Sequence, residues 1–124
     1  MSGIEGATAA DALRRFGACL EHGDTEAAAA CFTEDAVYEE PPRFAFTGRP
    51  ALRAFIADFL ARHTEVRFTV ARTLASADGA LMAAEWRWSY RSLDGSAHAF
   101  AGMCFVELRD GLIARWRGYS VAVG

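Results

Sequence analysis

Two adjacent carboxylates, Glu39 and Glu40, stand immediately before Pro41 and Pro42. Proline fixes its own backbone and disfavours a helical conformation at the preceding residue, so we expect Glu40 to end a strand. Side chains of a strand alternate between faces, so Glu40 shares a face with Tyr38 and Glu39 points the other way. In an apolar pocket, Glu40 would have a raised pKa and could abstract a proton or activate water. The alternative is a solvated pair of acids.

Three other side chains are candidates to assist such a carboxylate. Tyr38 and Tyr119, the latter on the last predicted strand, could each donate a hydrogen bond to a substrate oxygen. His98 follows the Asp94-Gly95 turn and could act as an acid or base at the mouth of a pocket. Each also has an ordinary interpretation, as a packed strand aromatic, a structural tyrosine or a surface histidine.

The expected walls of the pocket are apolar and mostly aromatic, which implies a flat or apolar ligand if the cavity is open. The alternative is that the same side chains simply fill the core. The residues assigned to the pocket are Phe16, Phe55, Phe59, Trp86, Trp88, Cys104 and Trp116.

Composition excludes several classes of protein. The 124 residues are 52% hydrophobic, which predicts one folded domain, placed at 8–124 after a loose tail at 1–7. The net charge is −3 and no basic stripe occurs, so we expect no nucleic acid partner. No apolar segment resembles a signal peptide or spans a bilayer, so we expect no membrane association.

The three cysteines, Cys19, Cys31 and Cys104, are widely spaced and form no CxxC motif. This pattern favours buried thiols in a reducing cytoplasm over disulfides, and it predicts neither a metal site nor a cofactor.

Periodicity predicts helices first and strands afterwards. Thr8 caps a helix that ends at Gly23, Asp24 caps a second, short helix, and Pro50 begins a third that runs through Leu60. Thr33-Glu34-Asp35 is predicted as a turn before the Tyr38 strand, and RFAFTG at 43–48 as a loop. From residue 64 onward, three Asp-Gly turns join four alternating strands into an antiparallel meander. The class is α+β, with helices packed on one curved sheet.

This order of elements resembles the cone-shaped nuclear transport factor 2-like superfamily, most closely its SnoaL-like and ketosteroid isomerase-like branch. The resemblance covers about residues 8 to 122, and it implies a strongly curved, mostly antiparallel sheet around a central pocket. The residues that carry it are Gly23-Asp24, Phe32 to Tyr38, Glu40-Pro41, Gly48, Phe55, and Asp110-Gly111-Leu112-Ile113 with Trp116 and Tyr119.

The resemblance implies that Glu40 occupies the position of the isomerase general base, one methylene longer than the usual aspartate. The two donors that hold a developing oxyanion in the isomerases would fall at Phe16, which has no hydroxyl, and near Cys104, a weak donor. This argues against ordinary ketosteroid isomerisation. Relatives commonly pair sheet to sheet, so the resemblance also implies a homodimer, for which the outward strip of Glu85, Arg87 and Ser89 is a candidate face.

Three functions remain open from the sequence. The first is a cofactor-free SnoaL-like enzyme that uses Glu40 on a small apolar organic molecule, by proton abstraction next to a carbonyl, aldol-type cyclisation, dehydration or water addition. The second is a module of the same fold that binds such a ligand without turning it over. The third is a structural association domain whose cavity is filled by its own tryptophans.

Overall fold

The computed structural model describes residues 8–123, and the tail expected at residues 1–7 lies outside this range. Three helices and six strands follow in the order α1 (Ala9–Glu21), α2 (Thr25–Ala29), β1 (Phe32–Glu40), β2 (Phe44–Thr47), α3 (Arg49–Arg62), β3 (His63–Ala75), β4 (Leu81–Ser92), β5 (Ala97–Arg109) and β6 (Leu112–Ala122).

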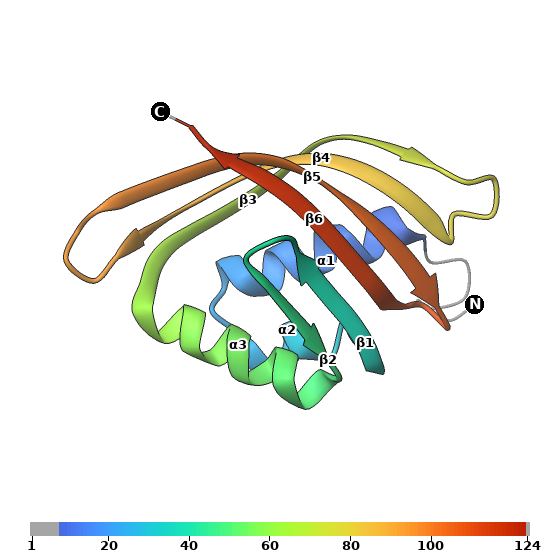
Figure 1. Cartoon of the computed structure of the whole chain (residues 1–124), viewed down its shortest axis with the longest axis horizontal. Coiled ribbons are helices and arrows are strands. Elements are labelled where there is room, and N and C mark those ends of the chain that lie inside the picture. The colour runs from blue at the N-terminus through green and yellow to red at the C-terminus, as the bar shows by residue number, and fades with distance from the viewer. Residues whose placement is uncertain (1–7, 124) are drawn as a thin grey trace.

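The six strands form one sheet with the order β2-β1-β6-β5-β4-β3. β3 to β6 form the expected antiparallel meander, and β1 returns to pair in parallel with β6. The sheet curves over the three helices, so that one face is concave and covered while the other is convex (Figure 1). The α+β cone expected from the sequence is therefore confirmed.

The helix boundaries follow from local chemistry. Thr8 and Asp11 form a capping box at the start of α1, and the Asp24 carboxylate accepts a hydrogen bond from the Ala27 amide at the start of α2. Gly23, between the two helices, has φ +71°, a conformation that glycine adopts without the steric penalty of a side chain. Pro50 lies in the first turn of α3, as its fixed φ favours.

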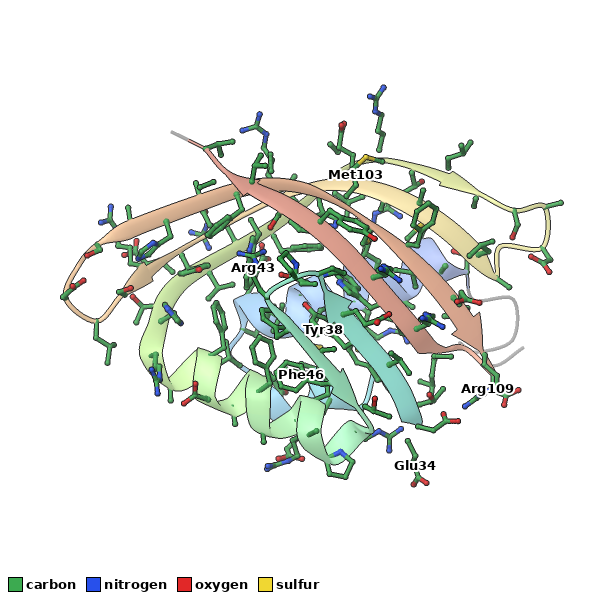
Figure 2. The ribbon with its side chains drawn as sticks, in the orientation of Figure 1. Glu34, Tyr38, Arg43, Phe46, Met103 and Arg109 are labelled. Carbon is green, nitrogen blue, oxygen red and sulfur yellow. The ribbon has the colours of Figure 1, made fainter. Side chains whose placement is uncertain are left out.

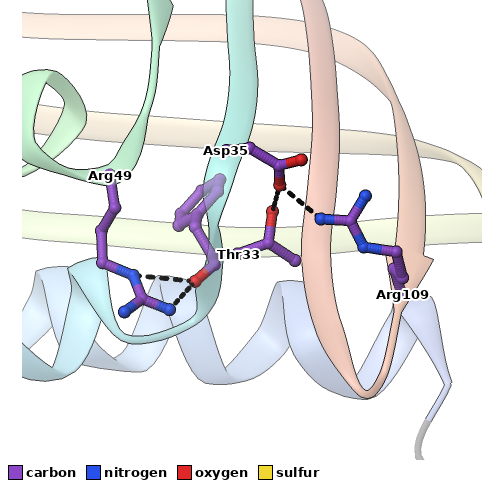
Figure 3. Close-up of polar contacts among 5 residues, drawn as sticks. Thr33, Asp35, Arg49 and Arg109 are labelled. Carbon is purple, nitrogen blue, oxygen red and sulfur yellow. Dashed lines mark hydrogen bonds and ion pairs between the residues drawn. The ribbon is translucent and has the colours of Figure 1, made fainter.

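Two local predictions are wrong. The expected turn at residues 33–35 is part of β1, which shifts register against β6 between Phe32 and Val37. The segment is extended because it packs Phe32, Thr33 and Ala36 into the protein interior. Asp35 accepts a hydrogen bond from Thr33 and pairs with Arg109 at the surface (Figure 3). The expected loop at 43–48 contains β2, whose backbone pairs with β1.

The concave face holds the core, together with the buried sides of α1 and α3. Trp86 and Trp116 are each only 2% exposed; Trp116 lies beside Phe16 of α1, and Trp86 lies beside Trp116. Arg49, at the start of α3, donates to the Phe32 carbonyl and ties this helix to the beginning of β1 (Figure 3). Within residues 8–123, no helix is long and apolar enough to cross a membrane.

Candidate functional site

A cavity of about 190 Å3 opens on the concave side of the sheet, between α3, the β1–β2 turn and strands β4 to β6. Its walls are mainly aromatic, with a carboxylate, a guanidinium, an imidazole and a hydroxyl among them. The lining residues are Tyr38, Glu40, Arg43, Phe44, Phe55, Phe59, His63, Trp88, Tyr90, Phe100 and Ser120.

Glu40 brings its carboxylate to this cavity because β1 ends there. Its side chain is only 14% exposed and shares the inner face with Tyr38, as strand alternation predicts. The Tyr38 hydroxyl lies 3.4 Å from Glu40 Oε1, a long hydrogen bond. The preceding residue, Glu39, points to the other face of β1 and pairs with Arg115 at 3.1 Å. Arg117, two residues further along β6, donates a hydrogen bond to the Tyr119 hydroxyl.

Arg43 faces Glu40 because the chain turns back at Pro41-Pro42. The Arg43 amide donates to the Glu40 carbonyl at 2.8 Å, which closes the turn and places the two side chains together. Arg43 Nη2 then donates to Glu40 Oε2 at 3.0 Å and to the Ser120 hydroxyl of β6 at 2.8 Å. The guanidinium therefore bridges the two sides of the cavity mouth, and its side chain is about half exposed.

Burial is the largest influence on the acid groups of the cavity. It raises the pKa of Glu40, while the Arg43 charge and the Tyr38 hydrogen bond act in the opposite direction. Burial also raises the pKa of the Tyr38 and Tyr90 phenols, and it raises the pKa of the Cys104 thiol to about 12. At neutral pH these three groups are therefore uncharged, and Glu40 is the one carboxyl among the described residues that line the cavity.

The residues assigned to the pocket from sequence fall into two groups. Phe55, Phe59 and Trp88 line the cavity. Phe16, Trp86, Cys104 and Trp116 are almost fully buried in the core, where they support the cavity without lining it.

The candidate polar partners of Glu40 are also divided. Tyr38 lines the cavity, whereas His98 does not: it stacks on Tyr90 and hydrogen-bonds Ser92. Tyr119 does not reach the cavity: it is 47% exposed on the convex face, where it accepts a hydrogen bond from Arg117. Trp116 and Tyr119 differ in strand parity, so they cannot both point inward.

Six cavity residues were not identified from sequence. Strand alternation could have identified two of them: Tyr90 lies two residues after Trp88 on β4, and Ser120 lies four residues after Trp116 on β6, so each shares the inward face of that tryptophan. The others come from the β1–β2 turn, from the unexpected β2 strand, from the first residue of β3 and from β5. The six are Arg43, Phe44, His63, Tyr90, Phe100 and Ser120.

The convex face carries a second feature, a shallow apolar groove across β4, β5 and β6. Met103, Phe105, Tyr119 and Val121 are between 47% and 66% exposed along it. Figure 2 shows Met103 on the outer side of the sheet, opposite to Tyr38 and Arg43. The groove adjoins the predicted outward strip of Glu85, Arg87 and Ser89, and Glu85 pairs there with Arg72 at 3.1 Å.

Comparisons with known proteins agree with this architecture. A family model described as SnoaL-like domain matches residues 13–116. No significant match is found among curated proteins. Among solved structures, a Bacillus subtilis protein suggested to be an isomerase superposes with a TM-score of 0.82 at 26% identity, covering 98% of this chain and 90% of its own.

Two further structures share the fold at 22% identity. An LEH-like epoxide hydrolase from Mycobacterium tuberculosis has a TM-score of 0.78 and covers 89% of this chain and 80% of its own. A second M. tuberculosis protein, in complex with estradiol-17beta-hemisuccinate, has a TM-score of 0.79 and covers 89% of this chain and 91% of its own. These likenesses establish the fold and leave the chemistry to the site.

Proposed function

This chain belongs to the SnoaL-like domain family, and from that membership we propose that it is a small-molecule enzyme in which Glu40 acts as the general base. The substrate is a compact, apolar organic compound, and the step assigned to Glu40 is removal of a proton from carbon next to a carbonyl. Tyr38 assists from the same face of β1. The chain's neighbours in fold include a suggested isomerase and an epoxide hydrolase, which is consistent with small-molecule chemistry at this pocket.

One observation carries this proposal: the Glu40 carboxyl is 14% exposed in an aromatic cavity, and burial raises its pKa. A base works best when its pKa lies near the working pH, because it is then ionised yet still accepts a proton readily. A solvated strand-end acid would show neither the burial nor the raised pKa.

The size of the cavity restricts the substrate. At about 190 Å3 it is smaller than the roughly 300–1,000 Å3 of pockets that hold drug-sized ligands. Its walls include Phe55, Phe59 and Trp88, which favour a flat ring. A molecule of one or two rings fits this description better than a steroid.

The pKa of Glu40 provides the direct test. We expect its carboxyl carbon, followed by NMR and assigned with Glu40→Gln, to titrate above the roughly 4.3 of a free glutamate. Because a raised native pKa means that the folded state binds this proton more tightly, Glu40 favours folding below pH 4 and loses that contribution as pH rises through its native pKa. We therefore expect the free energy of unfolding of Glu40→Gln to increase relative to that of the wild type as pH rises through the native pKa of Glu40.

Glu39→Gln is the matched control, because Glu39 is the adjacent residue and is also paired with an arginine, on the other face of the strand. The stability gain of Glu40→Gln over that pH range should exceed any gain of this control. A Glu40 titration at or below about 4.3 would show that burial does not control the ionisation of this carboxyl, and it would remove the observation that carries the enzyme proposal.

A second candidate function is ligand binding without turnover. It is favoured by the side chains at the two positions where isomerases carry oxyanion donors, since Phe16 has no hydroxyl and Cys104 is a buried thiol. The two functions are separated by whether the protein turns over a ligand in a reaction that depends on Glu40.

We also propose that the convex groove pairs with a second copy of this chain. An exposed apolar patch of this kind marks an interaction surface, and a two-fold axis through it would bury the same patch on both copies. We expect Phe105→Glu to raise the dimer dissociation constant about 100-fold or more, because burying an unpaired carboxylate costs several kcal/mol. Sedimentation velocity over a concentration series measures this constant.

Leu93→Glu is the control for the groove, since Leu93 is 71% exposed in the β4–β5 turn and away from it. This variant should associate like wild type. A wild-type chain that remains monomeric at high concentration would overturn the dimer proposal.

A further inference from the structure

Arg43 is the one guanidinium among the described residues that line the cavity. Its Nη2 group is shared between Glu40 and Ser120, at 3.0 and 2.8 Å. Within residues 8–123, its Nε and Nη1 groups make no hydrogen bond to protein, so up to three N–H donors remain available at the mouth. An arginine used only to neutralise Glu40 would not need to line the cavity or reach across to β6.

The surroundings of the pair leave Arg43 as the group suited to a negative charge. Burial keeps Tyr38 and Tyr90 as neutral phenols, which can donate a hydrogen bond but carry no charge, whereas the Arg43 guanidinium is a permanent cation. His63, whose Nδ1 lies 2.8 Å from the Phe59 carbonyl, stacks on the Phe59 ring. A guanidinium with free N–H donors can bind an oxygen anion through charge-assisted hydrogen bonds, and the aromatic wall beside Arg43 limits the access of water on one side.

We propose that Arg43, supported by the Ser120 hydroxyl, binds the substrate oxygen on which negative charge develops. This inference rests on the proposed function, and it defines the substrate class as compact cyclic compounds with a carbonyl oxygen that becomes an enolate. Arg43 thereby supplies the charge stabilisation that Phe16 and Cys104 do not.

The reaction step balances within the pocket. The C–H bond next to the carbonyl breaks, its proton goes to a Glu40 carboxylate oxygen, and its electron pair moves toward the carbonyl oxygen. Glu40 becomes neutral as the oxygen becomes negative, so the attraction that held Arg43 to Glu40 weakens at the moment when the oxyanion needs a partner. Return of the proton to carbon restores the original Glu40–Arg43 pair.

A phenolate resembles an enolate in shape and charge, and it therefore provides a binding test without turnover. We use 4-nitrophenol, whose neutral and ionised forms absorb at different wavelengths, and 4-nitroanisole, the methyl ether that cannot ionise. We expect the protein to bind 4-nitrophenol as its anion, and Arg43→Gln to weaken this binding about 10- to 100-fold, as for a lost hydrogen bond to a charged group. Binding of 4-nitroanisole should be unchanged in this variant.

Glu40→Gln gives the opposite expectation, because it removes the carboxylate that competes with the bound anion for Arg43. At neutral pH this variant should bind 4-nitrophenolate more tightly than wild type. Arg115→Gln is the matched control: the Arg115–Glu39 pair has nearly the same length and exposure as the Arg43–Glu40 pair, at 3.1 and 3.0 Å, but lies away from the cavity. This control should bind both probes as wild type does.

The outcomes separate this inference from the proposed function. If both probes bind with equal affinity, or if Arg43→Gln does not weaken 4-nitrophenolate, the pocket holds ligands without an anion site and the role of Arg43 is overturned alone. If neither probe binds and Glu40 titrates as a solvated acid, the inference and the proposed function fall together.

Discussion

Truncation of Trp116 to alanine is expected to lower the free energy of unfolding by about 3–5 kcal/mol, the usual range for a fully buried tryptophan. The indole is 2% exposed and stacks on Tyr38 at 5.3 Å between ring centroids. It also packs edge-on against Phe16 of α1 and lies beside Trp86 of β4. Its removal would leave a cavity where the helix, the sheet and the β1 strand meet. Urea unfolding at fixed protein concentration measures the loss.

Trp116→Phe separates packing from hydrogen bonding. Trp116 Nε1 is buried and has no hydrogen-bond partner among the described residues, which lowers the stability of the folded state. Replacing the indole with a phenyl ring removes this unpaired N–H group and its cost. We therefore expect the phenylalanine variant to lose less than half as much stability as the alanine variant. Trp88→Ala, in the partly exposed cavity wall, should also cost less. A Trp116→Ala loss below about 1 kcal/mol would show that this side chain does not anchor the core.

The fold was predictable because its signals are local. Helix caps, apolar spacing and Asp-Gly turns each act over a few residues, and together they specified the helices and the four-strand meander. The errors concern segments that depend on distant partners. β2 has only four residues and is extended because it pairs with β1. Residues 33–35 lie in a strand whose neighbours Phe32 and Ala36 are buried in the core, and Asp35 there contacts Arg109, 74 positions later.

The site was predictable in part for the same reason. Strand alternation before the two prolines placed Tyr38 and Glu40 on one face, with Glu39 on the other. Arg43 could not be identified, because an arginine after two prolines is typical of a solvated turn and its partner Ser120 is 77 positions away. Tyr119 was predicted as a donor at the pocket, but it points outward from β6, because the inward side of this strand carries Trp116 and Ser120.

The second large effect concerns Glu40 itself. We expect Glu40→Gln to lower kcat by about 10²–10⁴, the range supplied by a positioned general base. Glutamine keeps the shape of the side chain and its place beside Arg43, so binding of a neutral ligand should change little. Deuterium exchange at the carbon next to the carbonyl of compact cyclic ketones, followed by NMR, measures proton abstraction before any product is known.

Two comparisons make this exchange measurement decisive. Glu39→Gln should exchange at the wild-type rate, because its side chain lies on the other face with Arg115. The wild-type rate should rise with pH through the pKa of Glu40, since the ionised form is the base, and this rise should be absent from Glu40→Gln. Exchange that persists in Glu40→Gln would reject Glu40 as the base. A pocket that binds ketones but exchanges no proton, even with Glu40 intact, would instead identify a binding protein, because the carboxylate would then lie within reach of the ligand without acting on it.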